Sequence, residues 1–426
     1  MYVALLLFII TYILLLAKPK IKHWIAFSSA IIYILIGILS IKTAFLSIDF
    51  NVILMLLGTM GTVNLFIESK MPLLIADIII DKVHNVKMMT ICLAIFAGLI
   101  SAFIDNVATV LMIVPITIII AKKLNISPIP TVISVAIFSN LEGAATLVGD
   151  TTAILFASET KMNFLDFFFN DGKIGLFFIV QTGLIACILV LAFLQRKNTQ
   201  KIESKSKTEV NDYVPTILLV STILTLIVVS FIPNTLKLIN GIICITYFII
   251  GILIKYYKTK SSRAIKEIIK GIDFKTLLLL ASLFIIIGGI KEAGVINEIS
   301  NLFSKLGNNN PILLYSIIVL TSVIISAFID NIPYVATMLP IITMLAPIVN
   351  CNPLLLYYGL LIGSTLGGNI SPIGASANIT AIGLLNKNGY EMQAKTFYKY
   401  SIPLTLAAVI TSYLVTLLVF IQKTNH

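Results

Sequence analysis

The sequence predicts an all-α membrane protein that crosses the bilayer many times. Hydrophobic residues make up 58% of its 426 residues, and its mean hydropathy is +1.03, which exceeds what soluble globular chains carry. Apolar runs of about 16 to 21 residues recur along the whole length, as expected where helices cross roughly 30 Å of hydrocarbon. In addition, the phrase SAFIDN occurs twice, at 101–106 and at 326–331, which indicates a duplication.

The duplication continues beyond this phrase at the same spacing along the chain. The matching positions are Pro115 and Pro340, Ser139 and Ser364, Gly143 and Gly368, and Gly149 and Gly374. Residues 195–213 are charged and rich in Lys, Ser and Gln, which is typical of a linker. We therefore predict a first transmembrane repeat at 1–194, a cytoplasmic linker at 195–213 and a second repeat at 214–426.

The first copy begins with three apolar spans and an amphipathic segment, and it ends with a broken span and a final crossing. The spans are expected near 2–17, 24–40 and 51–67, an interfacial amphipathic helix at 72–87, a broken span at 128–158, an amphipathic piece at 160–173 and a last span at 174–194. The break in 128–158 is predicted because small and polar residues gather at its centre, in SNLEGAATLVGD (139–150).

Between these elements lies a stretch, 88–121, that is apolar at both ends and has Asp105-Asn106 at its midpoint. It is too long for one crossing and short for two. It is either one overlong helix or a re-entrant hairpin, and the polar pair favours the hairpin, because non-helical backbone is tolerated at membrane depth where it lines a cavity.

The second copy repeats this plan. Spans are expected at 214–231, 239–254 and 275–290, an amphipathic piece at 291–308, a hairpin at 311–349, a broken span at 353–385 and a final span at 400–421. Pro333, just past Asp330-Asn331, supports a break at the hairpin tip.

Each copy then has five crossings and one hairpin, so the second copy should lie inverted relative to the first. Of the 30 Lys and Arg residues, 23 fall in the segments 18–23, 68–87, 122–123, 195–213, 255–275 and 386–399. The positive-inside rule places these segments in the cytoplasm and both termini outside the cell membrane, with the two hairpins entering from opposite faces.

Four acidic residues are predicted at membrane depth: Asp105, Glu142, Asp150 and Asp330. No Lys or Arg is expected at that depth to pair with them, so they should take up protons, bind a cation or line a wet cavity. Hydrogen-bonded helix caps are the structural alternative for each. The carrier mechanism predicted from these carboxylates depends on two acidic hairpin tips that meet at mid-bilayer without a basic neighbour. A tip in bulk water, or a lysine or arginine bound to either tip, would contradict it.

Further binding candidates are the amides, hydroxyls and glycines around the hairpin tips and the broken spans, where free helix ends offer N–H and carbonyl groups to ions. They are Asn106, Asn140, Gly143, Thr146, Thr151, Asn331, Gly368, Asn369, Ser371, Ser376 and Asn378. Glu142 and Asp150 correspond to Gly367 and Ala375, so the substrate contribution is weighted to the first copy. Asp105, Asn106, Asp330 and Asn331 are the candidates for a bound sodium ion, and no other cofactor is expected.

The phrases SAFIDN, SNLEGAATLVGDTT (139–152) and GGNISPIGASAN (367–378) resemble the ion transporter superfamily, which includes arsenical-pump permeases, D-type sodium/proton antiporters and citrate-transporter-like carriers. The resemblance covers essentially the whole chain. It implies two inverted repeats, an elevator-like movement and a homodimer. It also implies that Asp105 and Asp330 stand where symporters keep a serine that helps bind sodium and substrate carboxylate.

We therefore predict a secondary active transporter for a small inorganic ion, driven by a proton or sodium gradient. Sodium/proton antiport and arsenite-type oxyanion efflux are the two main candidates, and sodium-coupled citrate or dicarboxylate transport is the alternative. The enzyme alternative is an intramembrane aspartyl protease, which also needs two membrane aspartates, but the phrase LVGD (147–150) lacks the first glycine of the GxGD signature and proteolysis does not explain the repeat, so an enzyme is not expected. A passive channel is a third possibility, which a dependence of flux on the proton or sodium gradient would exclude. There is no GxxxxGK[ST] loop, so ATP could be used only through an external ATPase subunit.

Overall fold

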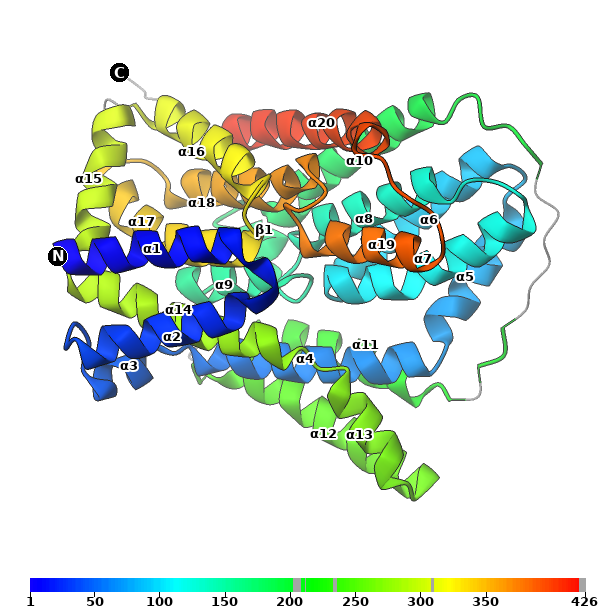
Figure 1. Cartoon of the computed structure of the whole chain (residues 1–426), viewed down its shortest axis with the longest axis horizontal. Helices are drawn as coiled ribbons and strands as arrows, with labels where there is room; N and C mark the ends of the chain where they lie inside the picture. The colour runs from blue at the N-terminus through cyan, green and yellow to red at the C-terminus, as the bar shows by residue number, and fades with distance from the viewer. Residues whose placement is uncertain (202–207, 211, 233–235, 308–309, 421–426) are drawn as a thin grey trace.

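The protein is almost entirely α-helical, as a computed structural model shows (Figure 1). The structure describes residues 1–201, 208–210, 212–232, 236–307 and 310–420. Parts of the predicted linker 195–213, and the last residues of the predicted segments 291–308 and 400–421, lie outside the described residues. The predicted all-α membrane class is confirmed.

Seven helices of the described chain are long and apolar enough to cross a membrane. They are α4 (Phe50–Glu68), α7 (Asn106–Lys123), α10 (Leu176–Leu194), α12 (Ile239–Thr259), α14 (Phe274–Glu292), α17 (Asn331–Val349) and α20 (Ala394–Phe420).

The first two predicted spans form a bent pair. Helix α1 (Tyr2–Ala17) is followed by the 3₁₀ turn η1 (Pro19–Ile21) and by α2 (Lys22–Leu35), with a bend of 111°. Pro19 explains the break, because it cannot continue the hydrogen bonding of α1. At about 24 Å and 21 Å, the two helices are shorter than a full crossing. In Figure 1 their turn lies near the middle of the molecule.

The stretch predicted at 88–121 is a helical hairpin, so the overlong-helix alternative is wrong. Helix α6 (Val86–Ser101) ends before a short turn, 102–105, and α7 begins at Asn106. The second hairpin has the same form, with α16 (Pro311–Ser326) and α17. The two hairpins extend toward opposite ends of the molecule, and their tips meet near its middle (Figure 1).

Both predicted broken spans are broken. In the first, α8 (Ile129–Gly143) and α9 (Thr151–Thr160) are separated by a non-helical loop. In the second, α18 (Pro353–Leu361) passes through the π turn η3 (Ile362–Leu366) and the 3₁₀ turn η4 (Gly367–Ile370) before α19 (Ser376–Lys387).

The remaining elements differ in places from the predicted ones. The segment 160–173 was expected to be amphipathic, but it contains the 3₁₀ turn η2 (Leu165–Phe167) and a two-stranded hairpin, β1 (Phe169–Asn170) and β2 (Lys173–Ile174). The interfacial helix α5 (Met71–Lys82) ends before 87, because Asn85 caps α6. The other helices are α3 (Ile41–Ser47), α11 (Val214–Val229), α13 (Ser262–Lys270) and α15 (Val295–Gly307).

The helices pack into two groups. In one group, α4 packs on α12 and α11, and α14 packs on α2 and α1. In the other, α6 packs on α8, α10 on α20, and α19 on α7 and α8. Gly58 allows the close contact of α4 with α12, since a Cβ there would lie 2.3 Å from the Cys244 carbonyl carbon. Contacts of α14 with α17 and of α4 with α9 connect the two groups. The first hairpin therefore packs with its broken helix, and the bent α1–α2 pair packs on α14.

Candidate functional site

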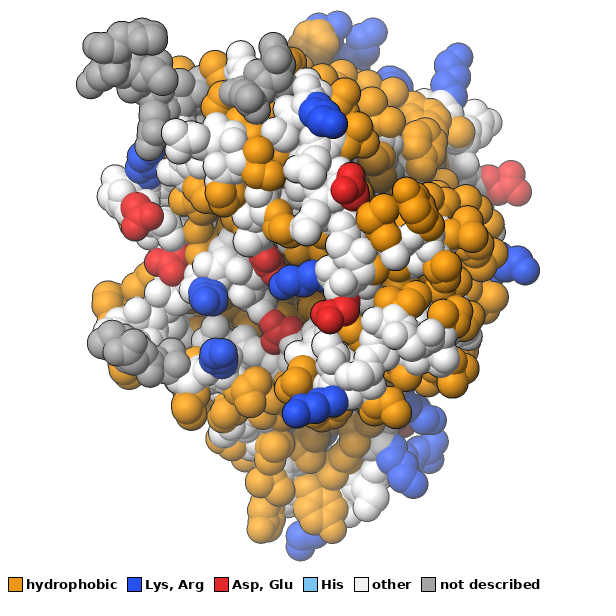
Figure 2. Space-filling model, turned by 90° about the vertical axis from the view of Figure 1, so that its left-hand side faces the viewer, with side chains coloured by type: hydrophobic (Ala, Val, Ile, Leu, Met, Phe, Trp, Pro, Cys, Tyr) orange, Lys and Arg blue, Asp and Glu red, His pale blue; other side chains and the backbone are white. Residues whose placement is uncertain are grey.

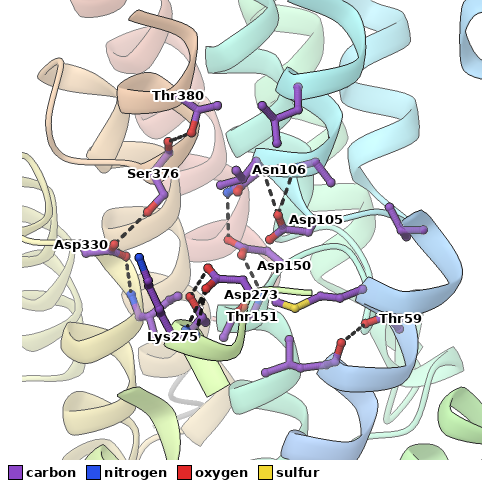
Figure 3. Close-up of a pocket in the computed structure, with 18 of the residues that line it drawn as sticks. Thr59, Asp105, Asn106, Asp150, Thr151, Asp273, Lys275, Asp330, Ser376 and Thr380 are labelled. Atoms are coloured by element: carbon purple, nitrogen blue, oxygen red, sulfur yellow. Dashed lines mark hydrogen bonds between the residues drawn. The ribbon is translucent and has the colours of Figure 1, made fainter. Parts of the chain in front are cut away.

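A cavity of about 480 Å³ lies between the two hairpin tips and the α1–α2 turn (Figure 3). Seven of the residues singled out from the sequence line it. They are Asp105, Asn106, Asp150, Thr151, Asp330, Asn331 and Ser376. Its other walls come from the second half of α4 and the first turn of α14. The cavity therefore extends from the tips toward the end of the molecule that carries the Lys-rich segments 68–87 and 255–275.

Three of the four acidic residues predicted at membrane depth are N-terminal helix caps, which is the alternative role expected for each of them. Asp105 Oδ2 accepts hydrogen bonds from the N–H groups of Val107 (3.0 Å) and Ala108 (3.2 Å) at the start of α7. Asp150 and Asp330 cap α9 and α17 through single backbone N–H groups. A carboxylate suits this place because the N-terminus of a helix carries partial positive charge.

Capping does not use all of the acceptor capacity of Asp105. In the described part of the chain, its Oδ1 accepts no hydrogen bond, and no Lys or Arg nitrogen lies within 4 Å of it. Asp150 lines the same cavity, and its Oδ2 accepts from Thr152 Oγ1 (3.2 Å) and Asn106 Nδ2 (3.4 Å). The first tip thus presents a free carboxylate oxygen beside a second acidic side chain.

Asp330 is in a different situation, and this corrects a central expectation. Lys22 Nζ, at the first residue of α2, forms an ion pair with Asp330 Oδ2. The expectation that no basic residue lies at this depth is therefore wrong for the second tip. The twofold-symmetric pair of unpaired carboxylates does not exist in this structure. The carrier mechanism predicted from that pair is therefore wrong, and the two tips differ in charge.

The reason for this error lies in the placement of segment 18–23. It was predicted to be a cytoplasmic loop, but its turn lies against the hairpin tips, and Lys20 and Lys22 line the cavity. A count of charges along the sequence cannot detect such a turn: Pro19 breaks the helix, but the packing of α1 and α2 on each other and on α14 places the turn at the tips.

Two further residues of the site were missed. Asp273 and Lys275, at the start of α14, line the cavity (Figure 3). A sequence signal existed for Asp273: the tripeptide Ile-Asp-Phe occurs at 48–50 and again at 272–274, close to the spacing of the hairpins. Each of these aspartates caps the following helix through two backbone N–H groups.

Behind the cavity, polar groups join the two broken helices. Asn140 Nδ2 donates to the carbonyl of Thr365 (2.6 Å) and to Asn369 Oδ1 (3.1 Å), and Asn140 Oδ1 accepts from Asn106 Nδ2 (2.8 Å). Asn369 in turn donates to the carbonyl of Ile137 (3.3 Å). The amides of Asn140 and Asn369 hold the loops of the two halves together and do not line the cavity.

The contact between each hairpin tip and its broken helix has the same form in both halves. Thr146 Oγ1 donates to the carbonyl of Ala102, and Ser371 Oγ donates to the carbonyl of Ala327. Gly149 and Gly374 also occupy equivalent cradles of carbonyl oxygens. A Cβ at Gly149 would lie 2.6 Å from the Gly143 oxygen, and one at Gly374 would lie 2.5 Å from the Gly368 oxygen.

Glu142 lies apart from the other acidic residues. Its side chain is fully buried between α8 and α10, Oε2 accepts from Gln181 Nε2 (2.7 Å), and Oε1 has no partner in the described part of the chain. Asn378 also lies outside the cavity lining; its amide donates to the carbonyl of Ser371 (3.2 Å). The structure thus does not bring Glu142 or Asn378 to the cavity.

A second cavity, of about 490 Å³, lies toward the opposite end of the molecule and reaches neither hairpin tip. Three of its lining residues correspond to lining residues of the first cavity at the spacing of the repeat, to within one position. The pairs are Asp49 and Asp273, Leu155 and Thr380, and Ala336 and Leu111. Figure 2 shows that end, where acidic and basic side chains gather around a hollow centre. Among the described residues, no group of three or more His, Cys, Asp or Glu side chains is placed to hold a metal ion.

Comparison with known families identifies the chain. The family model described as "Citrate transporter" matches residues 12–363. The chain belongs to the citrate transporter family. It is a membrane transporter, and the intramembrane protease alternative is dropped.

Relatives and a solved structure agree with this family. An uncharacterized transporter of Mycobacterium tuberculosis is 27% identical, over 96% of both chains. The P protein of Homo sapiens is 24% identical, over 85% of this chain and 52% of its own length. The crystal structure of the YdaH transporter of Alcanivorax borkumensis has a TM-score of 0.61 at 12% identity, covering 88% of this chain and 86% of that one, which shows a shared fold.

Proposed function

We propose that this transporter is a secondary active carrier that couples movement of a small ion to a proton or sodium gradient, with the coupling cation held at the first hairpin tip. The observation that carries the proposal is the free Oδ1 of Asp105, which lines the cavity with no cationic side chain beside it in the described part of the chain. An ionised carboxylate in a low-dielectric site needs a counter-ion or a proton, and a carrier can supply either from the gradient.

The neighbouring groups support a cation or proton at this place. Asn106 and Thr151 line the cavity beside Asp105 and offer an amide oxygen and a hydroxyl. The carbonyl oxygens around Gly149 lie close behind the tip. Oxygen ligands of this kind suit a hard cation such as sodium, so Asp105 and Asn106 remain the sodium candidates, whereas Asp330 already has a cation in Lys22.

Alternating access is the mechanism that the two cavities support. Related positions line a cavity at each end, and only one of these two cavities reaches the tips. This is the arrangement expected of inverted repeats in one of two exchanging states. By the positive-inside rule, the cavity that reaches the tips opens to the cytoplasm, and both termini lie outside.

Sodium/proton antiport is the first candidate for the transported ions. A carboxylate substrate is the second, and it is favoured by the citrate transporter family and by three lysines in the cavity wall, Lys20, Lys22 and Lys275. An oxyanion of the arsenite type would use the same cavity.

Flux into proteoliposomes tests the proposal. Sodium, lithium, arsenite, succinate and citrate are each offered under an imposed pH step or an imposed sodium gradient. Uptake or release of one of them that depends on the gradient is expected, and flux that is indifferent to both gradients would refute the carrier. Asp81→Asn, an exposed carboxylate on α5, serves as the control for Asp105→Asn.

A further inference from the structure

The two hairpin tips have the same sequence but different counter-charges. At the first tip, Asp105 has one oxygen free and no basic partner in the described part of the chain. At the second tip, Asp330 Oδ2 accepts from Lys22 Nζ and from Ser376 Oγ (2.9 Å), and Oδ1 accepts from the N–H of Ile332 (3.3 Å). Both oxygens of Asp330 therefore already have donors, one of them a cation. Figure 3 shows the contact of Asp330 with Ser376.

The ion pair is partly buried. The Lys22 side chain is 25% exposed and the Asp330 side chain is 18% exposed. The ammonium group of Lys22 lies beside the carboxylate of Asp330, where a bound monovalent cation would otherwise lie. It supplies the same single positive charge. The second copy supplies no lysine that could pair with Asp105 as Lys22 pairs with Asp330. At the spacing of the two copies, the positions that correspond to Lys22 are Thr246 and Tyr247.

Lys22 also lies on a different helix pair from its partner. Helix α2 packs on α1 and α14, whereas Asp330 lies at the tip of the α16–α17 hairpin. Tyr12 of α1 makes a second contact of this kind, donating to the carbonyl of Pro333 (2.7 Å). The bent α1–α2 pair therefore brings a fixed cation to the second hairpin tip.

We propose that the Lys22 ammonium acts as a built-in counter-cation and occupies the cation-binding site at the second hairpin tip. The carrier therefore binds its coupling cation from solution at the first tip alone. The proposal rests on the proposed function and narrows it. Lys22 sets the number of coupling ions, and removing its charge opens a second sodium place at Asp330.

Equilibrium binding of radioactive sodium to the purified full chain at fixed alkaline pH tests the proposal. Lys22→Met is expected to bind one sodium ion more per chain than the wild type, and the extra ion is expected to disappear in the double variant Lys22→Met/Asp330→Asn. Lys22→Arg keeps the charge, and Lys18→Met removes an exposed charge of the same turn that does not line the cavity; both are expected to bind as the wild type does.

A chemical variant covers the case in which Lys22→Met does not fold. Lys22→Cys, in a chain whose four native cysteines are replaced by alanine, is expected to bind the extra sodium ion. Treatment with an aminoethyl thiosulfonate, which restores an ammonium group at the side chain, is expected to remove it.

The proposal is overturned if the neutral variants bind no more sodium than the wild type, or if the extra ion remains when Asp330 is replaced. Failure of the proposed function has a different signature. In that case the wild type shows no gradient-dependent flux, while the gain of sodium binding at Asp330 is still measured in Lys22→Met.

Discussion

Asp49 accepts a hydrogen bond from Ser158, whereas Asp273, its counterpart in the second copy, has no such bond to another helix among the described residues. Both aspartates cap the next helix: Asp49 bonds the N–H groups of Asn51 and Val52, and Asp273 those of Lys275 and Thr276. The position equivalent to Ser158 is Gly383, which has no hydroxyl to donate. The Asp49–Ser158 hydrogen bond thus joins α4 and α9. Both residues line the second cavity, which does not reach the hairpin tips.

Ser158→Ala is expected to loosen the contact of α4 with α9 and so to extend the second cavity toward the hairpin tips. A hydrogen bond to a charged group contributes about 1.5–3 kcal/mol, so its loss shifts the balance of states by roughly tenfold or more. The measurement is labelling of a cysteine placed at Ala336 by an impermeant maleimide, in a chain without native cysteines.

Thr160→Ala is the matched control for this change. It removes a hydroxyl from the same helix, one that donates to the Phe156 carbonyl of that helix. Equal labelling rates in the two variants would show that the hydrogen bond between Ser158 and Asp49 does not keep the second cavity separate from the hairpin tips.

Asp105→Asn is expected to insert normally and to lose gradient-dependent flux by at least the about 10- to 100-fold that loss of an outer-shell partner costs at a metal site, because Asp105 is proposed as a ligand itself. The amide can still approach the N–H groups of Val107 and Ala108 through its oxygen, so the start of α7 is preserved, but the negative charge is gone. Flux in vesicles, normalised to inserted protein, is the measurement, and full activity would exclude Asp105 as the cation site.

Asp330→Asn is expected to lose coupled flux as well, but for a different reason. It leaves the ammonium of Lys22 without its partner, and because the pair is only partly buried the cost should fall below the about 3–5 kcal/mol of breaking a fully buried pair. Thermal unfolding should therefore show a loss of stability, which the double variant Lys22→Met/Asp330→Asn recovers in part. If the loss of stability in the double variant equals the sum of the losses in the two single variants, Lys22 and Asp330 do not interact.

Gly149→Ala and Gly374→Ala are each expected to separate a hairpin tip from its broken helix. An added Cβ would meet backbone carbonyl oxygens at 2.6 Å and 2.5 Å, and backbone cannot easily move aside. We expect a cost of about 1–3 kcal/mol or more in each case, seen as a lower melting temperature in detergent.

Gly383→Ala provides the comparison, because a Cβ at that position has no neighbour within 4 Å in the described structure. Alanine in a helix is favoured over glycine, so this variant should match the wild type or exceed it slightly. A similar loss of stability in all three variants would mean that the carbonyl cradle does not explain the effect.

Glu142→Gln is expected to keep gradient-dependent flux, because Glu142 faces Gln181 and does not line the cavity. Glu142→Ala leaves the Gln181 amide without its acceptor and should cost about 1–3 kcal/mol of stability. Loss of coupling in Glu142→Gln with unchanged stability would instead restore Glu142 to the ion-binding set.

Much of the fold could be predicted from the sequence because its signals are local. Apolar runs set the long helices, a polar pair within 88–121 set the hairpin turn, and small residues within 139–150 set the break between α8 and α9. The recurrence of SAFIDN predicted two hairpins of the same form, and α6 and α16 begin and end at equivalent positions of the two copies. Each of these features depends on residues close together in the chain.

The tertiary structure alone decided which charges meet. Lys22 and Asp330 are far apart in the sequence, and only the 111° bend between α1 and α2, packed against α14, brings that lysine to the second hairpin tip. Helix packing likewise turned Glu142 away from the cavity and placed Asp273 in its wall. Hydropathy assigns a residue to a depth, but the electrostatic energy of a buried charge depends on the few ångströms around it, which helix packing sets.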